Sequence, residues 1–191
     1  MQLVQANREH LASYVAALRA GWSFDTSRSA AAKEELERIE ANADQFLGSL
    51  HDPEAKGDPI TLPDGSTVAR LPGFVKWMWD GEFCGSIGLR WANGTEALPP
   101  HCLGHIGYSV VPWKRRLGYA TQALKLLLPE AKTVGLRFVQ ITTDVDNVTS
   151  QRIVTTAGGV LMERFTKLPQ NGGGEGLRLG SICSRTQSGW I

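Results

Sequence analysis

The sequence predicts a mixed α/β (α+β) fold, in which a mostly antiparallel, twisted sheet contains one central pair of parallel strands. A strand, a helix and a second strand follow one another between residues 104 and 143, and this order predicts a right-handed crossover that makes the two strands parallel. Asp80-Gly81 lies between two apolar runs and predicts a tight antiparallel hairpin. Two runs at 160–167 and 177–183 predict a closing antiparallel pair.

Two helices are predicted before the first long strand, at residues 8–20 and 29–50. The segment between them carries Trp22 and Phe24, which either fill the core or wall a pocket for the acceptor. Residues 51–66 are rich in Pro, Gly and Asp, and they predict a surface loop with a turn.

The hairpin strands are predicted at 74–79 and 83–90. Trp77 and Trp79 alternate with polar and flexible residues, so that one aromatic face is expected to pack on the core. A loop from Trp91 to His101 leads into the central strand.

The central strand is predicted to end at Pro112, because proline offers no amide to a continuing ladder. A short basic turn follows, and then an apolar stripe predicts a helix. The stripe consists of Ala120, Leu124, Leu127, Leu128 and Ala131. Free amides and the positive end of the helix dipole meet at this turn, so it suits an anion, with phosphate as the preferred ligand. The alternative is an ordinary strand-to-helix connection.

The remaining elements follow from turn signals. Gly135 predicts the end of the helix, and a strand is predicted at 138–143. A helix is expected from Asn147 to Thr156, and a glycine-rich loop at 170–176 is predicted to be mobile rather than a nucleotide cradle. Residues 184–191 show no period.

Composition predicts one domain spanning residues 1–191, with 42% hydrophobic residues for a core. The net charge of +1 argues against a nucleic-acid or membrane partner. We expect no signal peptide, and a cytoplasmic protein with reduced thiols, since the three cysteines have no CxxC spacing. The same spacing argues against a metal site.

The basic turn reads Arg115-Arg116-Leu117-Gly118-Tyr119-Ala120, and Asn147-Val148-Thr149-Ser150 and Ala157-Gly158-Gly159 follow it. This pattern resembles the GNAT superfamily of acyl-CoA-dependent N-acyltransferases over about half of the chain, from Phe83 to roughly Arg164, and most closely its bacterial members of unassigned substrate. The resemblance implies helices on both faces of the sheet. It also implies N-terminal helices (1–66) that shape the acceptor side, an acetyl-CoA-binding core (67–167) and a C-terminal loop and strand (168–191).

By this resemblance acetyl-CoA is the co-substrate, and no metal is needed. Its pyrophosphate would lie on the amides of the basic turn, with charge from Arg115 and Arg116. Its pantetheine arm would lie between the two diverging parallel strands, where the amide of Val110 would polarise the thioester. The implied cofactor-binding residues are Ser109, Val110, Val111, Arg115, Arg116, Leu117, Gly118, Tyr119, Ala120, Thr121, Asn147 and Ser150.

Many relatives carry a tyrosine acid seven residues after the asparagine, but Val154 stands there in this chain. The resemblance then implies Ser150 as the proton donor, and the alternative is that Ser150 and Asn147 only cap the helix. An attacking amine must lose a proton, and the candidate bases are Glu82, His101, His105 and Tyr108. A lone histidine near a strand end is more often structural.

The sequence therefore predicts an N-acetyltransferase that moves an acetyl group from acetyl-CoA to a primary amine of a small molecule or peptide within a ternary complex. The alternatives are a non-catalytic acyl-CoA-binding or regulatory domain and a phosphate-binding domain unrelated to CoA. The sequence identifies neither the acceptor nor the oligomeric state, and it is compatible with a homodimer.

Overall fold

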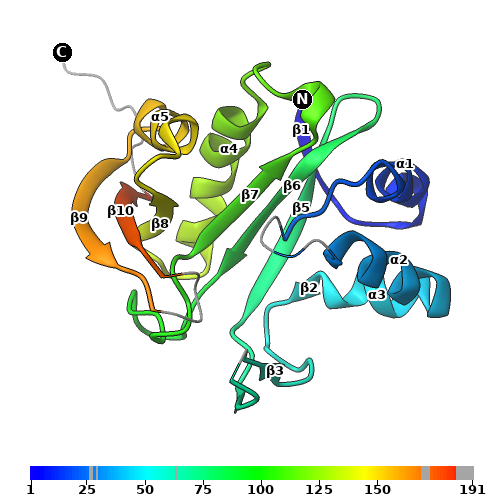
Figure 1. Ribbon diagram of the computed structural model, residues 1–191, viewed down its shortest axis with the longest axis horizontal. Coiled ribbons are helices and arrows are strands. Elements are labelled where there is room, and N and C mark those ends of the chain that lie inside the picture. The colour runs from blue at the N-terminus through cyan, green and yellow to red at the C-terminus, as the bar shows by residue number, and fades with distance from the viewer. Residues whose placement is uncertain (26–27, 29, 63, 169–172, 184–191) are drawn as a thin grey trace.

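The computed structural model describes residues 1–25, 28, 30–62, 64–168 and 173–183. Its elements, in chain order, are β1 (Gln2–Gln5), α1 (Arg8–Arg19), α2 (Ala31–Ala41), α3 (Ala43–Ser49), β2 (His51–Asp52), β3 (Ile60–Thr61), β4 (Thr67–Val68), β5 (Gly73–Trp79), β6 (Phe83–Arg90), β7 (Ile106–Val110), the 3-10 turn η1 (Pro112–Lys114), α4 (Tyr119–Thr133), β8 (Phe138–Asp144), α5 (Val148–Thr156), β9 (Val160–Thr166) and β10 (Glu175–Ile182). Figure 1 shows their arrangement.

The first sheet has the strand order β1-β5-β6-β7, and β2 also pairs with β5. Its pairings are antiparallel, and the predicted hairpin joins β5 to β6 across Asp80-Gly81. Gly85 in β6 has φ +151°, and a Cβ there would lie 2.3 Å from the carbonyl oxygen of Ser109 on β7. Only glycine therefore lets β6 and β7 approach this closely.

The second sheet has the order β8-β10-β9 and is also antiparallel, as predicted for the closing pair. The central pair, β7 and β8, meets at one end: the His105 amide donates to the carbonyl of Gln140 at 2.8 Å. Thr142 adds a side-chain bond to the carbonyl of Leu103 at 2.6 Å. Among the described residues no backbone bond joins the strands beyond this point, so the expected sheet is split into two at its centre.

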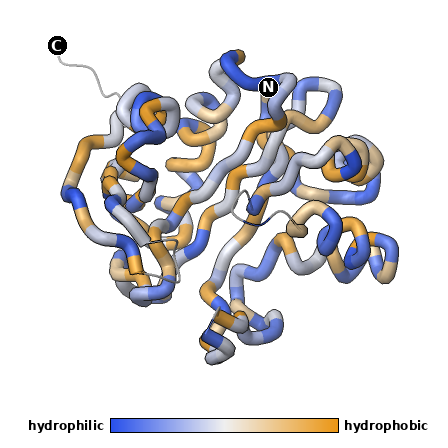
Figure 2. The backbone as a smooth tube through the Cα atoms, in the orientation of Figure 1, coloured by the Kyte–Doolittle hydropathy of each residue, from blue (hydrophilic) through white to orange (hydrophobic). Residues whose placement is uncertain are grey.

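Both faces of the first sheet are buried. Helices α1–α3 cover one face around Tyr14, Phe46 and Trp77, while α4 covers the other around Met78 and Leu124. Helix α5 packs against α4 and the second sheet. Adjacent residues Trp77 and Met78 are both fully buried because successive side chains of a strand point to opposite faces. Apolar residues accordingly gather along the central strands in Figure 2.

The predicted helix at 29–50 was wrong, because two helices lie there. Asn42 between α2 and α3 has extended backbone angles (φ −162°, ψ 96°), and its side chain accepts the amide of Gln45. An asparagine cap thus starts a new helix inside one continuous apolar pattern. The predicted loop at 51–66 also contains short strands, β2 and β3, and the N-terminal strand β1 was not predicted.

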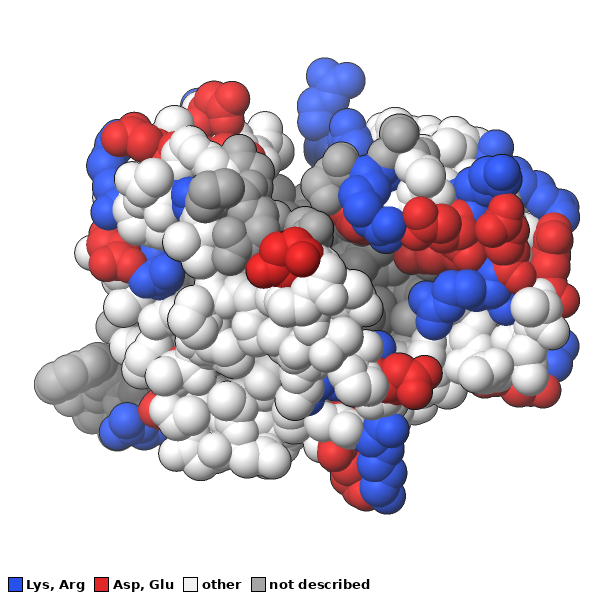
Figure 3. Space-filling model, turned by 60° about the horizontal axis from the view of Figure 1, so that its bottom comes forward, with Lys and Arg blue, Asp and Glu red and all other residues white. Residues whose placement is uncertain are grey.

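Charged side chains are unevenly distributed over the surface. In Figure 3 both signs are interspersed over the helical side at the right, while much of the remaining face carries few charges. Ion pairs on that helical side include Arg8 with Asp44 and Lys33 with Glu37. The predicted C-terminal tail and the residues 170–172 of the predicted glycine-rich loop lie outside the described residues.

Candidate active site

The connection between β7 and α4, which we term the α4 entry loop (residues 112–118), contains two left-handed residues. Arg116 has φ +65° and Gly118 has φ +77°. Apart from its two chain neighbours, no described heavy atom lies within 4 Å of the position that a Cβ of Gly118 would take. The backbone of this loop is therefore turned to face open space rather than the protein.

The N-terminus of α4 has no side-chain cap. Gly118 stands at the cap position, whereas α1, α3 and α5 each begin with an asparagine whose side chain accepts a backbone amide. Gln122 makes the first backbone bond of the helix, to Gly118, so the amides before it lack an intrahelical acceptor. Free donors and the positive helix end are features that suit an anion.

The basic residues of the predicted site lie at this same loop. Arg115, Arg116 and Leu117 are exposed, and Leu117 is 57% exposed. The guanidinium of Arg115 folds back, and its Nε donates to the carbonyl of Val110 at 3.3 Å. The end of β7 and the entry loop are thereby joined.

A polar cluster that was not predicted anchors the entry loop to the β5–β6 hairpin. The Tyr119 hydroxyl donates to the carboxylate of Asp80 at 2.5 Å, and Lys114 Nζ lies 3.1 Å from the same group. The pKa of Asp80 is lowered, chiefly by the Tyr119 bond, and the pKa of Lys114 is raised, chiefly by Glu82 and then by Asp80. These residues are distant in sequence, so no local pattern revealed the cluster.

Glu82, a predicted base, belongs to this anchor. Its Oε1 lies 2.7 Å from Lys114 Nζ. The contact favours a role for Glu82 in holding the entry loop.

Strand β7 presents different groups on its two faces. The Ser109 hydroxyl is buried and accepts a bond from Trp22 Nε1 at 3.1 Å, and Val111 is fully buried in the same cluster. Their side chains are therefore committed to the core. The Val111 amide donates to Cys84 on β6, and since successive amides point to opposite strand edges, the Val110 amide points away from β6, toward the β8 side.

On that side, two predicted catalytic residues meet. The hydroxyl oxygens of Tyr108 and Ser150 lie 2.8 Å apart, and either can donate. The pKa of Tyr108 is raised, mainly by burial, which keeps its hydroxyl protonated near neutral pH. The helix cap at α5 is Asn147, whose side chain accepts the Ser150 amide at 3.0 Å. The Ser150 side chain is therefore not needed as a cap.

Val154, one turn after Ser150, is fully buried in the core. The position that a Cβ of Gly159 would take lies only 2.5 Å from a methyl of Val154. Val154 is thus packed closely against Gly159, and a larger side chain at residue 154 would have to displace its neighbours.

His105, another predicted catalytic residue, is a core side chain with 0% exposure. The Gln140 amide donates to its Nδ1 at 3.0 Å, so the neutral ring carries its proton on Nε2. Burial lowers the pKa of His105 to about 4, and the positive charge of Arg90 contributes. With its free lone pair already in a hydrogen bond, His105 has the geometry of a structural histidine.

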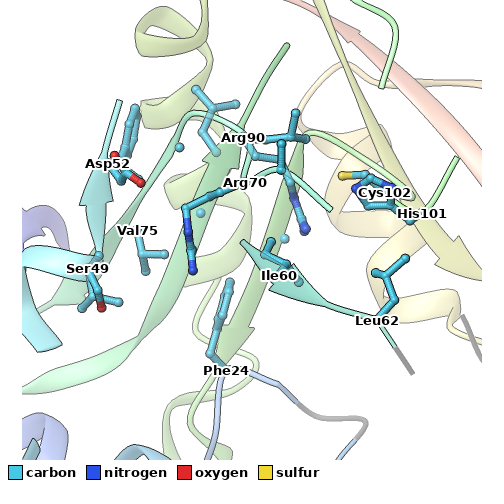
Figure 4. A pocket seen from close by; sticks show the side chains of 18 residues that line it. Phe24, Ser49, Asp52, Ile60, Leu62, Arg70, Val75, Arg90, His101 and Cys102 are labelled. Atoms are coloured by element: carbon cyan, nitrogen blue, oxygen red, sulfur yellow. The ribbon is translucent and has the colours of Figure 1, made fainter. Parts of the chain in front are cut away.

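A cavity of about 320 Å³ opens on the α1–α3 face of the first sheet. Its lining includes Phe24, Arg70, Arg90, His101 and Gly107, and Gly107 immediately precedes Tyr108 on β7. Phe24 thus lines a pocket, whereas Trp22 is buried in the core. Each of the two positions expected for these aromatic residues is therefore occupied by one of them. Figure 4 shows Arg70 and Arg90 extending in the same direction, toward the end where Phe24 lies.

Sequence reasoning missed Arg70 and Arg90. Arg90 ends β6 and Arg70 lies between β4 and β5. An isolated arginine carries no sequence pattern that distinguishes a pocket from a surface. Among the described residues there is no group of three or more potential metal ligands, and no described helix is both long and apolar enough to cross a bilayer.

Comparisons with known proteins show the family and the fold. The family model "Acetyltransferase (GNAT) domain" matches residues 27–160. No curated protein sequence matches the chain. The chain belongs to the GNAT acetyltransferase family, and its mixed fold is the one predicted.

Several solved structures share this fold. A microcin self-immunity acetyltransferase in complex with acetyl-CoA and AMP matches with a TM-score of 0.60 and 12% identity, covering 94% of this chain and 91% of that one. A ribosomal alpha-N-protein acetyltransferase in complex with coenzyme A gives 0.60 and 15%, with 94% and 92% covered. A spermidine N-acetyltransferase chimera from Vibrio cholerae and hSSAT gives 0.62 and 12%, with 95% of each chain covered.

Proposed function

We propose that the protein is an N-acetyltransferase that moves an acetyl group from acetyl-CoA to a primary amine within a ternary complex. The observation that carries this proposal is the uncapped N-terminus of α4 behind a left-handed entry loop, in a chain of the GNAT family. Two similar structures contain acetyl-CoA or CoA. The names of the similar proteins include a ribosomal alpha-N-protein acetyltransferase and a spermidine N-acetyltransferase.

The entry loop fits a CoA pyrophosphate. The amides of residues 116–121 would bind the phosphate oxygens, and Arg115 and Arg116 would add charge. The Val110 amide, which points toward the β8 side of β7, would support the thioester oxygen, and Asn147 would bind the pantetheine arm. Acetyl-CoA would supply the activated acetyl group and a thiol leaving group.

The Tyr108–Ser150 pair suits proton donation to the departing thiolate. One hydroxyl would give its proton to the departing thiolate while it takes the proton of the other, and solvent water would then reprotonate the second hydroxyl. The raised pKa of Tyr108 keeps its hydroxyl protonated before the transfer. His101 lines the cavity, so among the predicted bases its position best suits accepting a proton from an amine bound there. We therefore assign the acceptor side to the cavity and to residues 1–66.

The test is release of free thiol from acetyl-CoA in the presence of a panel of amines, with CoA binding measured separately by calorimetry. We expect a calorimetric signal with CoA and amine-dependent thiol release. CoA binding without thiol release from any amine would favour the non-catalytic acyl-CoA-binding domain. Binding of inorganic phosphate but not of CoA at millimolar concentration would favour an unrelated phosphate-binding domain.

A further inference from the structure

The cavity lined by Phe24 and Gly107 carries an excess of positive charge. Its lining contains two arginines, Arg70 and Arg90, and one carboxylate, Asp52. The cavity volume of about 320 Å³ lies at the lower end of the range typical of sites for small molecules. Whether this charge is available to a ligand depends on the partners that each charged side chain already has.

Asp52 is already engaged. Its two carboxylate oxygens accept the amides of Lys56 at 2.8 Å and of Gly57 at 2.9 Å. These bonds, led by that of Gly57, lower the pKa of Asp52, and Arg70 contributes to the lowering. Asp52 stays ionised as the closing group of its own loop, and it offsets part of the charge of Arg70.

Arg90 has no such partner. No hydrogen bond or ion pair joins its guanidinium to any residue in the part of the chain that the structure describes. The side chains outside that part include no Asp or Glu. Arg70 donates from Nε to the carbonyl of Asp58 at 3.1 Å, which leaves its terminal nitrogens for another acceptor.

The guanidinium group of Arg90 lies close to strand β7, next to the residue that precedes Tyr108. A Cβ on Gly107 would lie 3.8 Å from a terminal nitrogen of Arg90 and 3.8 Å from the Phe24 ring. Gly107 is the residue before Tyr108 on β7, so the guanidinium lies over the strand that would carry the acetyl group. An acceptor held by Arg90 would thus have its anionic end close to that strand.

We propose that the acceptor is a small amine that also carries an anionic oxygen group, a carboxylate or a phosphate, which binds between Arg70 and Arg90. This inference rests on the proposed acetyltransferase function and names the class of its acceptor. Arginine forks bind such groups with two parallel hydrogen bonds. A polyamine is disfavoured, because its ammonium groups would meet two guanidinium groups with only one carboxylate nearby.

The experiment measures binding by isothermal titration calorimetry to protein loaded with CoA, so that turnover is not required. Matched probes differ in charge: a panel of amino acids against their primary amides, and phosphoethanolamine against ethanolamine, with spermidine as the polyamine. We expect an anionic probe to bind about tenfold or more tightly than its neutral partner. The two series distinguish a carboxylate from a phosphate.

Arg90→Gln removes the unpaired charge and is expected to abolish this preference, while Arg164→Gln, an exposed arginine on β9, leaves it unchanged. Arg70→Lys keeps the charge but loses the fork, so an intermediate preference is expected. Equal binding of charged and neutral partners, preferred binding of spermidine, or no binding of any anionic probe would overturn the proposal. If CoA binds and only the preference is missing, this inference fails and the acetyltransferase assignment stands. If CoA itself does not bind, it is the assignment that fails.

Discussion

Tyr108 on β7 and Ser150 on α5 are forty-two residues apart in the chain, and their hydroxyl oxygens lie 2.8 Å from each other. The bond lies beside the region where β7 and β8 no longer pair, and it joins the first sheet to helix α5, which follows β8 in the chain. Because Asn147 caps α5, the Ser150 hydroxyl is free to serve Tyr108. This arrangement yields a prediction about proton transfer.

Ser150→Ala and Tyr108→Phe should each lower kcat by about 10- to 100-fold if the pair protonates the thiolate. Since the hydroxyls act as one unit, the double variant should be little worse than either single one. Single-turnover thiol release with a saturating amine is the measurement. Thr149→Ala, at the exposed neighbouring residue, is the control and should be unchanged. An unaltered rate in Ser150→Ala, with chemistry shown to be rate-limiting, contradicts the relay.

Gly118→Val should abolish the rise in melting temperature that CoA causes, because a side chain would stand where the phosphates approach and the left-handed backbone would be strained. Gly135→Val is the matched control, since Gly135 has φ +91° and equally open surroundings. Both variants should lose a similar stability of about 1 kcal/mol, from the cost of a left-handed residue. Normal CoA binding by Gly118→Val would exclude a phosphate at this backbone.

Tyr119→Phe should weaken CoA binding about three- to tenfold, because the entry loop loses its bond to Asp80. The same change should raise the lowered pKa of Asp80, since Tyr119 is the largest cause of that shift. The sign follows: the carboxylate contributes stability above its unfolded pKa, about 3.9, and loses it as pH falls toward the lower folded value. Calorimetry and an NMR titration of Asp80 test both effects. Tyr14→Phe, which removes a hydroxyl bonded to Glu35 instead, should leave CoA affinity unchanged.

His105 should make the protein less stable in mild acid. Its folded pKa of about 4 lies below the ordinary value of 6.5, so between these values the unfolded chain binds more protons. As pH falls through this window the free energy of unfolding should drop by roughly 3 kcal/mol from this group. Urea unfolding at several pH values measures it.

His105→Asn provides an oxygen that can accept the Gln140 amide but does not titrate, so its stability should depend less steeply on pH. His51→Asn changes an exposed histidine and should keep the wild-type slope. Equal slopes in all three proteins would show that His105 is not the responsible group.

Local sequence patterns determined most of the elements of this fold. Gly135, Asp80-Gly81 and the apolar stripe of α4 act over a few residues, because turn geometry and helical spacing are short-range properties. The basic turn and the helix that follows it could also be predicted from the sequence, because a glycine at a helix start is a feature of adjacent residues. Occupation of the entry loop by CoA stays a prediction.

Tertiary structure decided what depends on residues far apart in the chain. The apolar pattern at 29–50 predicts one helix, but the chain turns at Asn42. In this turned backbone the Asn42 side chain accepts the amide of Gln45 and caps a second helix. The Tyr108–Ser150 bond, the Asp80 anchor and the unpaired charge of Arg90 each arise where separate elements pack together. From residue type alone, His105, Glu82 and Tyr108 were equal candidates for the catalytic base. The structure distinguishes them: His105 is buried in the core, Glu82 forms an ion pair with Lys114, and the Tyr108 hydroxyl contacts Ser150. Burial and spatial partners are properties of the packed chain, so the sequence alone could not separate these roles.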